Sequence, residues 1–224
     1  MLISHKYKFI TIDIPKTGTK TLRETLLPII PIDVIGKGDN PNDYFYQHCN
    51  VNACERGFKK RGWDFNSYKK FSTLRNPWKR YVSLLMYKIN KGNKYKNATG
   101  TELAEWNQLE KIQGKKCSEA FDRHGRNEVD FLKFIIKQNP SQDTFVLNKN
   151  GEIAIDILGD LDNFDSHFLN FCEKVGLPNI PSLKHSNKSS YKKPYTEYYI
   201  QELIDMVAEK EKWVINNFNY NFQK

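Results

Sequence analysis

Aromatic and β-branched residues are concentrated in two short stretches of the chain, and each stretch leads directly into a turn. The first run covers 7–14 and the second covers 68–74. Short runs rich in β-branched and aromatic residues are typical of buried strands. Pro15 to Gly18 ends the first run, and 19–27 then favours a helix up to a proline. The pattern therefore predicts a strand, a tight turn and a helix at the start of the chain.

The second run is followed by the same arrangement. Arg75-Asn76-Pro77 forms a turn, and 78–90 is predicted to be a helix, with the proline suited to its first turn. Its apolar residues recur at helical spacing and should face a sheet. Two such units predict an α/β, P-loop-NTPase-like three-layer fold, with a central mainly parallel sheet flanked by helices.

The remaining chain gives weaker signals. We expect an exposed loop at 91–100, where the sequence is polar and contains glycine, and a hairpin over 145–158 around an Asn-Lys-Asn-Gly turn. The periodicity predicts further helices at 102–112, 129–138, 161–175 and 196–218, with a loop at 178–194. No internal repeat or linker is visible, so we expect a single domain over 1–224.

The composition is that of a folded, basic protein. Hydrophobic residues make up 39% of the chain, which is enough for a core. The chain has 35 Lys and Arg against 26 Asp and Glu, a net charge of +9. This excess favours anionic partners, although a solvated lysine-rich surface explains most of it equally well. Because no nucleic-acid-binding motif is visible and the aromatics follow core periodicity, we expect no nucleic-acid partner.

The cysteines and the N-terminal residues indicate the cellular compartment in which we expect the protein. The four cysteines form no CxxC pair, which favours reduced thiols. A zinc site from His48, Cys49 and Cys54 would lack a fourth ligand, so we expect no metal. Residues 1–14 enter an apolar strand without a signal-peptide pattern, and no window is long and apolar enough to span a membrane. We expect a soluble, cytoplasmic protein without a stable membrane anchor.

The turn after the first strand has the chemistry of an anion-binding loop. It reads Pro15-Lys16-Thr17-Gly18-Thr19-Lys20-Thr21. A turn that feeds a helix N-terminus points backbone N–H groups at one spot, and Gly18 lets the backbone approach a ligand closely. Lys16 adds a full positive charge, and the threonines add hydroxyl donors. A Walker loop is excluded because Thr19 separates the glycine from Lys20. An ordinary strand–turn–helix connection remains the alternative.

This loop resembles the 5′-phosphosulfate loop of sulfotransferases that use PAPS (3′-phosphoadenosine-5′-phosphosulfate), most closely the carbohydrate sulfotransferases of heparan sulfate and chondroitin type. The resemblance implies that Pro15 to Thr21 binds PAPS and that Lys16 is catalytic. Arg75, followed by Pro77 and Ser83, resembles the family's 3′-phosphate motif, with Asn76 where the family usually has Asp. Taken singly, a helix-flanking arginine and a serine bonded to a backbone carbonyl explain these residues better; taken together with the loop upstream, the phosphate motif is the better explanation.

The resemblance extends along nearly the whole chain. Residues 155–164 are similar to the family's strand and turn, but Asp162 takes the place of its usual glutamate, which leaves that glutamate's role in doubt. Residues 185–189 resemble an Asn-Lys-Ser loop that folds over the nucleotide in relatives. Lys188 and Ser189 are therefore implied to bind PAPS, although a solvated basic loop explains them equally well.

The resemblance implies transfer of a sulfuryl group from PAPS to an acceptor hydroxyl, leaving PAP (adenosine 3′,5′-bisphosphate) without help from a metal. We expect a carbohydrate acceptor, and the net charge hints at an acidic glycan. His48 lies between the two phosphate motifs, like the catalytic base of uronyl 2-O-type relatives, and His185 is the second candidate. His5, His124 and His167 are poorer candidates.

Three other functions stay open at this point: a P-loop kinase or NTPase, a basic nucleic-acid-binding module, and an inactive anion-binding protein. The expected lack of a membrane anchor separates the chain from Golgi-resident relatives. It favours a bacterial protein or a viral one acting in the host cytoplasm.

Overall fold

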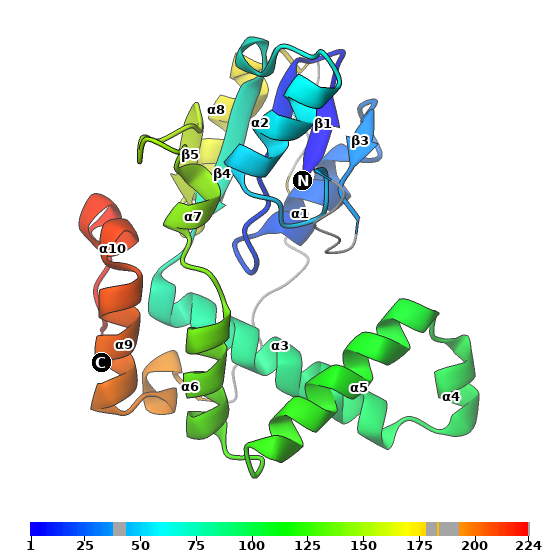
Figure 1. Ribbon diagram of the computed structural model, residues 1–224, viewed down its shortest axis with the longest axis vertical. Coiled ribbons are helices and arrows are strands. Elements are labelled where there is room, and N and C mark those ends of the chain that lie inside the picture. Colours follow the sequence, from blue (N-terminus) through cyan, green and yellow to red (C-terminus); the bar gives the residue numbers. More distant parts are fainter. Residues whose placement is uncertain (38–43, 178–182, 184–192, 224) are drawn as a thin grey trace. The chain divides into compact units, whose positions relative to one another are not determined.

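The computed structural model describes residues 1–37, 44–177, 183 and 193–223, which divide into two compact units. The units are made of these segments: unit 1 of Met1–Asn76, Ser141–Lys188 and Trp213–Tyr220; unit 2 of Pro77–Pro140, Ser189–Lys212 and Asn221–Lys224. Unit 1 carries the sheet and unit 2 is helical (Figure 1). The single domain over 1–224 stays a prediction.

The sheet of unit 1 has five short strands in the order β3-β1-β2-β4-β5. The strands are β1 (Leu2–Ser4), β2 (Phe9–Thr11), β3 (Val34–Ile35), β4 (Lys69–Leu74) and β5 (Ile157–Asp160). β4 pairs in parallel with both β2 and β5, whereas β1 is antiparallel to both of its neighbours. The α/β prediction is confirmed, but parallel pairing is limited to β2, β4 and β5. The four residues that join β1 to β2 are too few for a parallel crossover, so these strands form a hairpin.

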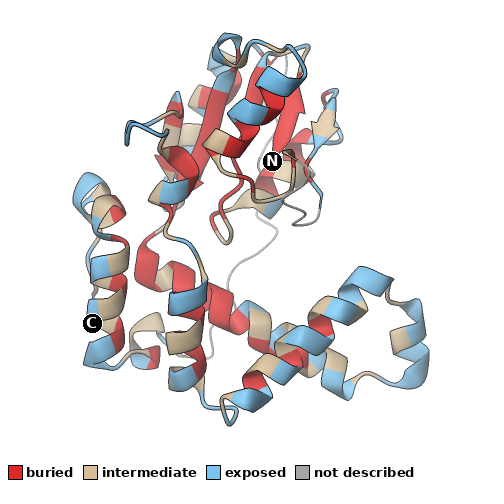
Figure 2. Ribbon diagram, in the orientation of Figure 1, coloured by how far each residue is buried: buried red, intermediate tan, exposed pale blue. Residues whose placement is uncertain are grey.

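Helices cover both faces of this sheet. On one face, α1 (Thr19–Leu26) and α8 (Phe164–Lys174) pack against Phe9 and Phe71. On the other face lie α2 (Val51–Lys60) and α7 (Asp143–Val146), which share a core cluster with Ile10 and Leu74. Successive strand side chains point to opposite faces, so each strand contributes to both clusters. β1, β2 and most of β4 are buried, whereas the edge strand β3 is partly exposed (Figure 2). A short 3₁₀ helix, η1 (Phe65–Ser67), precedes β4.

Unit 2 is built around one long helix. Its elements are α3 (Pro77–Asn97), α4 (Gly100–Glu105), α5 (Gln108–Arg123), α6 (Glu128–Gln138), the 3₁₀ helix η2 (Tyr195–Tyr198) and α9 (Gln201–Lys210). The last helix, α10 (Lys212–Phe218), begins in unit 2 and continues into unit 1. In the part of the chain that the structure describes, no helix is both long and apolar enough to cross a membrane.

Two predictions about unit 2 were wrong. The loop expected at 91–100 is mostly helix, because α3 continues to Asn97. Gly92 does not break α3, since it is the point where α5 approaches: a Cβ there would lie 2.8 Å from the Ser118 nitrogen. The helix expected over 196–218 is interrupted at Glu211, whose carboxylate is buried and bonded to Arg80.

Two further boundaries differ from the sequence prediction. The helix expected at 102–112 is divided between α4 and α5, because Asn107 caps α5 through a capping box. The hairpin expected over 145–158 is reduced to the turn and one bridge, between Leu147 and Ile153. Phe145 lies in α7 instead, where it joins the core.

Candidate functional site

The loop between β2 and α1 has an unusual backbone. Lys16 and Gly18 both have positive φ, 72° and 92° respectively. This conformation is costly for lysine and natural for glycine. Gly18 also lies against the start of α8, where an added Cβ would come within 2.8 Å of Leu161. The glycine is therefore favoured chiefly by its backbone conformation, since the Leu161 contact is with the end of a flexible side chain.

Hydroxyl groups hold the loop in shape. The Oγ1 atoms of Thr17 and Thr19 both donate to the Ile14 carbonyl, at 3.0 and 3.2 Å. From β4, Thr73 Oγ1 donates to the Thr17 carbonyl at 2.6 Å. In this structure the threonine hydroxyls thus tighten the turn and fix it to the neighbouring parallel strand. Direct contact of these hydroxyls with a phosphate stays a prediction.

The loop ends at the N-terminus of α1. The first bond of the helical ladder runs from Leu22 N–H to the Gly18 carbonyl, at 3.1 Å. The amides of Thr19, Lys20 and Thr21 precede that bond, and such amides point toward the helix N-terminus, where the helix dipole is positive. The Lys20 side chain is exposed and pairs with Glu24 at 3.4 Å, while Thr21 is buried.

Arg75 brings the second predicted phosphate motif to this loop. It follows β4 directly, and its Nη1 donates to the Lys16 carbonyl at 3.2 Å. Because β2 and β4 are parallel neighbours, their carboxyl ends meet at one edge of the sheet. Burial lowers the pKa of the Lys16 ammonium, and the nearby Arg75 charge lowers it further. Two cationic side chains thus meet at this edge.

Gln142 fixes the backbone of Arg75, which the sequence did not reveal. The Arg75 N–H donates to Gln142 Oε1, and Gln142 Nε2 donates to the Arg75 carbonyl, both at 2.9 Å. Gln142 is fully buried. Its partner is 67 residues away, so no local pattern could have indicated this pairing.

His48 also lies at this edge. Its Nδ1 is 2.8 Å from the carbonyl oxygen of Asp13, which precedes the loop. Since a carbonyl oxygen only accepts, Nδ1 carries the proton, and in the neutral ring Nε2 is then the basic nitrogen. The Asp13 side chain is held by Arg23 Nε at 2.9 Å. Asn50 caps α2 through its side chain, which fixes the segment that carries His48.

The remaining candidate residues are found in both units or outside the described part of the chain. In unit 1, His5 Nδ1 bonds the Tyr68 hydroxyl at the opposite edge of the sheet, and His167 lies 3.3 Å from Asp160. His124 ends α5 in unit 2, and Ser83 is buried on α3, also in unit 2. Three predicted residues lie outside the described part of the chain: His185, Lys188 and Ser189.

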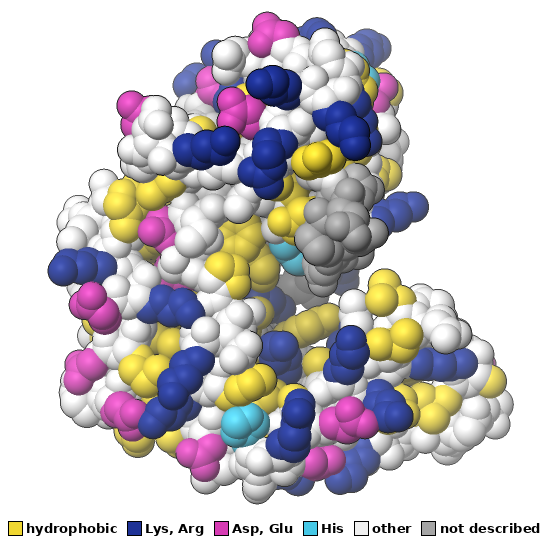
Figure 3. Space-filling view, in the orientation of Figure 1, with side chains coloured by type: hydrophobic (Ala, Val, Ile, Leu, Met, Phe, Trp, Pro, Cys, Tyr) yellow, Lys and Arg dark blue, Asp and Glu magenta, His cyan; other side chains and the backbone are white. Residues whose placement is uncertain are grey.

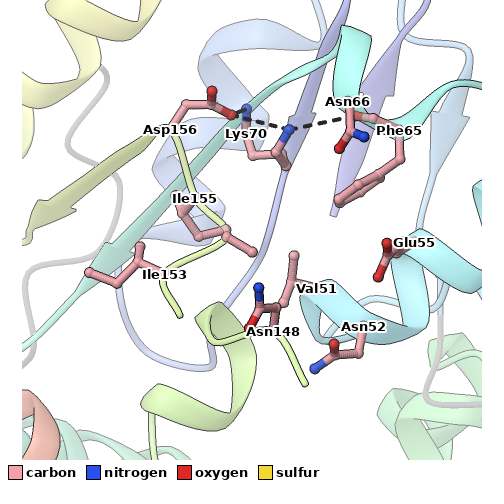
Figure 4. Close-up of a pocket in the computed structure, with 11 residues that line it drawn as sticks. Val51, Asn52, Glu55, Phe65, Asn66, Lys70, Asn148, Ile153, Ile155 and Asp156 are labelled. Atoms are coloured by element: carbon pink, nitrogen blue, oxygen red, sulfur yellow. Dashed lines mark hydrogen bonds and ion pairs between the residues drawn. The ribbon is translucent and has the colours of Figure 1, made fainter. Parts of the chain in front are cut away.

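A separate hollow of about 260 Å³ lies in unit 1 beside α2 (Figure 4). Lys70 lines it and is held by the Tyr68 carbonyl at 2.7 Å and by the Asp156 carboxylate at 3.3 Å. Asn52 donates to the Leu147 carbonyl, while its Oδ1 has no hydrogen-bond partner among the described residues. Glu55 completes the polar lining on the α2 side. The sequence did not single out this hollow.

Basic side chains are not confined to the loop. Figure 3 shows Lys and Arg over the visible face of both units, interspersed with Asp and Glu. The positive charge on this face is therefore dispersed and does not by itself mark a nucleic-acid surface. Among the described residues, no group of three or more His, Cys, Asp or Glu could hold a metal ion.

Comparison with protein-family models matches residues 1–214 to a family described as "Sulfotransferase family". The chain belongs to the sulfotransferase family. Searches of curated proteins and of solved structures each returned no match. The family match covers the loop, Arg75, Gln142 and His48, and it supports sulfuryl transfer as the activity of this sulfotransferase. The family match does not identify the sulfuryl donor or the molecule that accepts the sulfuryl group.

Proposed function

We propose that this sulfotransferase transfers the sulfuryl group of PAPS to a hydroxyl of a carbohydrate. One observation carries the proposal: the phosphosulfate-like loop and Arg75 meet at the ends of two parallel strands, with Arg75 Nη1 3.2 Å from the Lys16 carbonyl. Family membership alone does not assign a substrate, so the argument rests on this site.

The two ends of PAPS match the two cationic positions. The helix N-terminus and Lys16 would receive the 5′-phosphosulfate, where backbone N–H groups and the helix dipole favour negative charge. Arg75 would bind the 3′-phosphate, since a guanidinium can donate two parallel hydrogen bonds to phosphate oxygens. The lowered pKa of Lys16 supports this assignment, because a half-buried ammonium beside an arginine is stabilised by a bound anion.

Sulfuryl transfer would proceed by in-line displacement, as phosphoryl transfer does. The bond between sulfur and the bridging oxygen of PAPS breaks as the acceptor oxygen bonds to sulfur. Protonated Lys16 would stabilise the charge that develops on the departing bridging oxygen, and PAP leaves. Positioning and electrostatics account for catalysis in this scheme.

His48 would take the proton of the acceptor hydroxyl. Its Nδ1–H is donated to the Asp13 carbonyl, so the tautomer leaves Nε2 as the accepting atom. The same hydrogen bond orients the ring beside the strand end that leads to Lys16. This arrangement supports a base and a leaving-group cation that act at one centre.

The hollow beside α2 supports a carbohydrate acceptor. Asn52 and Glu55 are three residues apart and project from the first turns of the helix that follows His48. Amide and carboxylate side chains suit the hydroxyl groups of a sugar, and the apolar Val51 and Ile155 beside them suit its carbon faces.

The proposal is tested by transfer of ³⁵S-sulfate from labelled PAPS to a panel of neutral and acidic oligosaccharides, a tyrosine-containing peptide and a small alcohol. The expected result is that an oligosaccharide becomes labelled and that PAP is released in the same reaction. Label only in the peptide or the alcohol would overturn the carbohydrate acceptor. Release of PAP without any labelled acceptor, or no reaction, would contradict transfer to these classes.

Thermal-shift measurements distinguish the proposed sulfotransferase from the alternative enzyme class, a P-loop kinase or NTPase. Ligand binding raises the unfolding temperature by mass action. We expect PAP to protect the protein more than ATP with Mg²⁺ or NAD. Protection by ATP with Mg²⁺ but not by PAP would favour a kinase-like function instead.

A further inference from the structure

We propose that Gln142 is the positioning residue for recognition of the 3′-phosphate of the nucleotide. It would act through the backbone of Arg75, and this inference rests on the proposed function. The two hydrogen bonds between the Gln142 carboxamide and Arg75, each 2.9 Å long, have the donor and acceptor pattern of a strand pair. The side chain thus replaces the partner strand that Arg75 lacks beyond the end of β4.

Arg75 is placed where the backbone needs such support. β4 ends at Leu74, and the chain passes from unit 1 into unit 2 after Asn76. The regular ladder with β5 reaches Leu74, where the Leu161 N–H still bonds the Leu74 carbonyl at 2.8 Å. The N–H and C=O of Arg75 are the next groups along this strand, and Gln142 satisfies both.

Gln142 is itself held firmly. It has no solvent exposure, and it stands one residue after the chain returns to unit 1. A buried carboxamide without hydrogen-bond partners is unfavourable, because it has given up its bonds to water, so the pairing with Arg75 is favoured over a loose arrangement. The following residues form α7, whose Phe145 and Val146 are buried in the core of unit 1.

The guanidinium of Arg75 depends on this fixed backbone. It must extend from the strand end to the Lys16 carbonyl, and a bidentate phosphate contact tolerates little rotation. Loss of the carboxamide would act directly on the backbone of Arg75, and it would reach the 5′-phosphate loop only through the contact of Arg75 with the Lys16 carbonyl. Gln142 should therefore affect the 3′-phosphate selectively.

The test is a double-mutant cycle with Gln142→Met and Arg75→Ala in the full chain. Methionine is similar in length but lacks the amide, and Gln201→Met on exposed α9 provides the matched control. Calorimetry measures affinity for PAP and for adenosine 5′-monophosphate, which differ only in the 3′-phosphate. Their ratio is insensitive to a general loss of stability, because both ligands need the same folded site.

We expect Gln142→Met to lower the ratio of PAP affinity to adenosine monophosphate affinity by roughly tenfold, the effect of a misplaced charge-assisted hydrogen bond. In the Arg75→Ala background the same substitution should cause no further decrease, because coupled residues are not additive. An unchanged ratio in Gln142→Met, or an equal decrease in both backgrounds, would overturn the role of Gln142.

The outcomes also separate this inference from the proposed function. A wild-type protein that binds PAP no more tightly than adenosine monophosphate would contradict the proposed nucleotide site itself. A clear preference of the wild type for PAP that survives Gln142→Met would contradict only the positioning role. If Gln142→Met does not fold, Gln142→Asn keeps an uncharged amide but is one methylene shorter and cannot hold both Arg75 groups equally well, so it should show a smaller decrease of the same ratio. A ratio at the wild-type value in that variant would overturn the inference.

Discussion

Two charged clusters, one in each unit, place arginines that are five residues apart in very different surroundings. In unit 1, Arg75 donates to the Lys16 carbonyl, and its positive charge helps to lower the Lys16 pKa. In unit 2, Arg80 is fully buried and donates to Glu211 Oε1 at 2.9 Å and to the Pro140 carbonyl. Tyr81 also donates to Glu211, at 3.0 Å.

We interpret the cluster in unit 1 as functional and the cluster in unit 2 as structural. In unit 2 the Glu211 carboxylate neutralises the Arg80 cation, so this cluster needs no ligand to balance its charge. Its effect is on the stability of the fold. In unit 1 two cations lie together, which disfavours the protonated form of Lys16 and favours a bound anion. We therefore expect substitutions in the first cluster to affect binding and transfer, and substitutions in the second to affect folding.

The largest expected effect is that of Lys16→Ala. Removal of a transition-state cation typically costs about 10³–10⁵-fold in turnover. Stability should stay unchanged or rise slightly, since a half-buried ammonium is removed. Steady-state transfer and thermal unfolding measure the two properties, with the exposed Lys59→Ala as control. Full activity in Lys16→Ala would refute the role of the loop.

His48→Ala should lower turnover by roughly 10²–10⁴-fold, the usual size of a general-base loss. PAP affinity should not change, because the base contacts the acceptor hydroxyl. Single-turnover transfer and calorimetry separate these effects. His5→Ala, at the opposite edge of the sheet, is the matched control. A normal rate in His48→Ala would exclude this residue from the mechanism.

The two arginines can be compared by one substitution. Arg80→Met should lower the free energy of unfolding by about 3–5 kcal/mol, because Glu211 would be left buried and unpaired. Arg75→Met should change it by less than about 1 kcal/mol but weaken PAP binding by roughly 10–100-fold. Denaturant unfolding and calorimetry are the measurements.

The double variant Arg80→Met with Glu211→Met sharpens this comparison, since it removes both charges and should regain most of the lost stability. Equal losses of stability in Arg75→Met and Arg80→Met would show that the two clusters do not differ in the way described.

The smallest expected effect concerns pH. In the proposed mechanism Lys16 acts in its protonated form, so we expect activity to fall as pH rises through its lowered pKa. Arg75→Met removes one cause of that lowering, so the alkaline limb of kcat/KM for PAPS, which reports the ligand-free enzyme, should move to higher pH. Because the unfolded chain binds this proton more tightly, Lys16 also makes the folded state more stable as pH rises over the same window. NMR titration of the Lys16 side chain gives the pKa directly. If the Lys16 pKa does not rise in Arg75→Met, the electrostatic coupling between Lys16 and Arg75 is contradicted.

The parts of the fold that the sequence predicted are those with strong local signals. The apolar run before Pro15, the turn at Gly18 and the helix that follows it are all as expected, because each signal depends on neighbouring residues. The same holds for β4 and the start of α3. Lys16, Arg75 and His48 could be predicted as candidates from the motif spacing and the resemblance.

The remaining features depend on distant partners. Gly92 suggests a loop until α5 is known to pack against it, and Glu211 suggests a surface helix until Arg80 is known to bind it. Gln142 carries no local signal, because its function depends on Arg75, 67 residues earlier. Such pairings follow from tertiary structure and not from propensity.

The central claim is that a doubly phosphorylated adenosine binds across the ends of β2 and β4. A crystal structure of the protein with PAP tests it most directly. We predict the 5′-phosphate against the backbone amides of the loop from Lys16 to Thr21, with Lys16 Nζ beside it, and the 3′-phosphate within hydrogen-bond distance of Arg75. PAP bound elsewhere, or bound at this edge without contact to Lys16 and Arg75, would contradict the account.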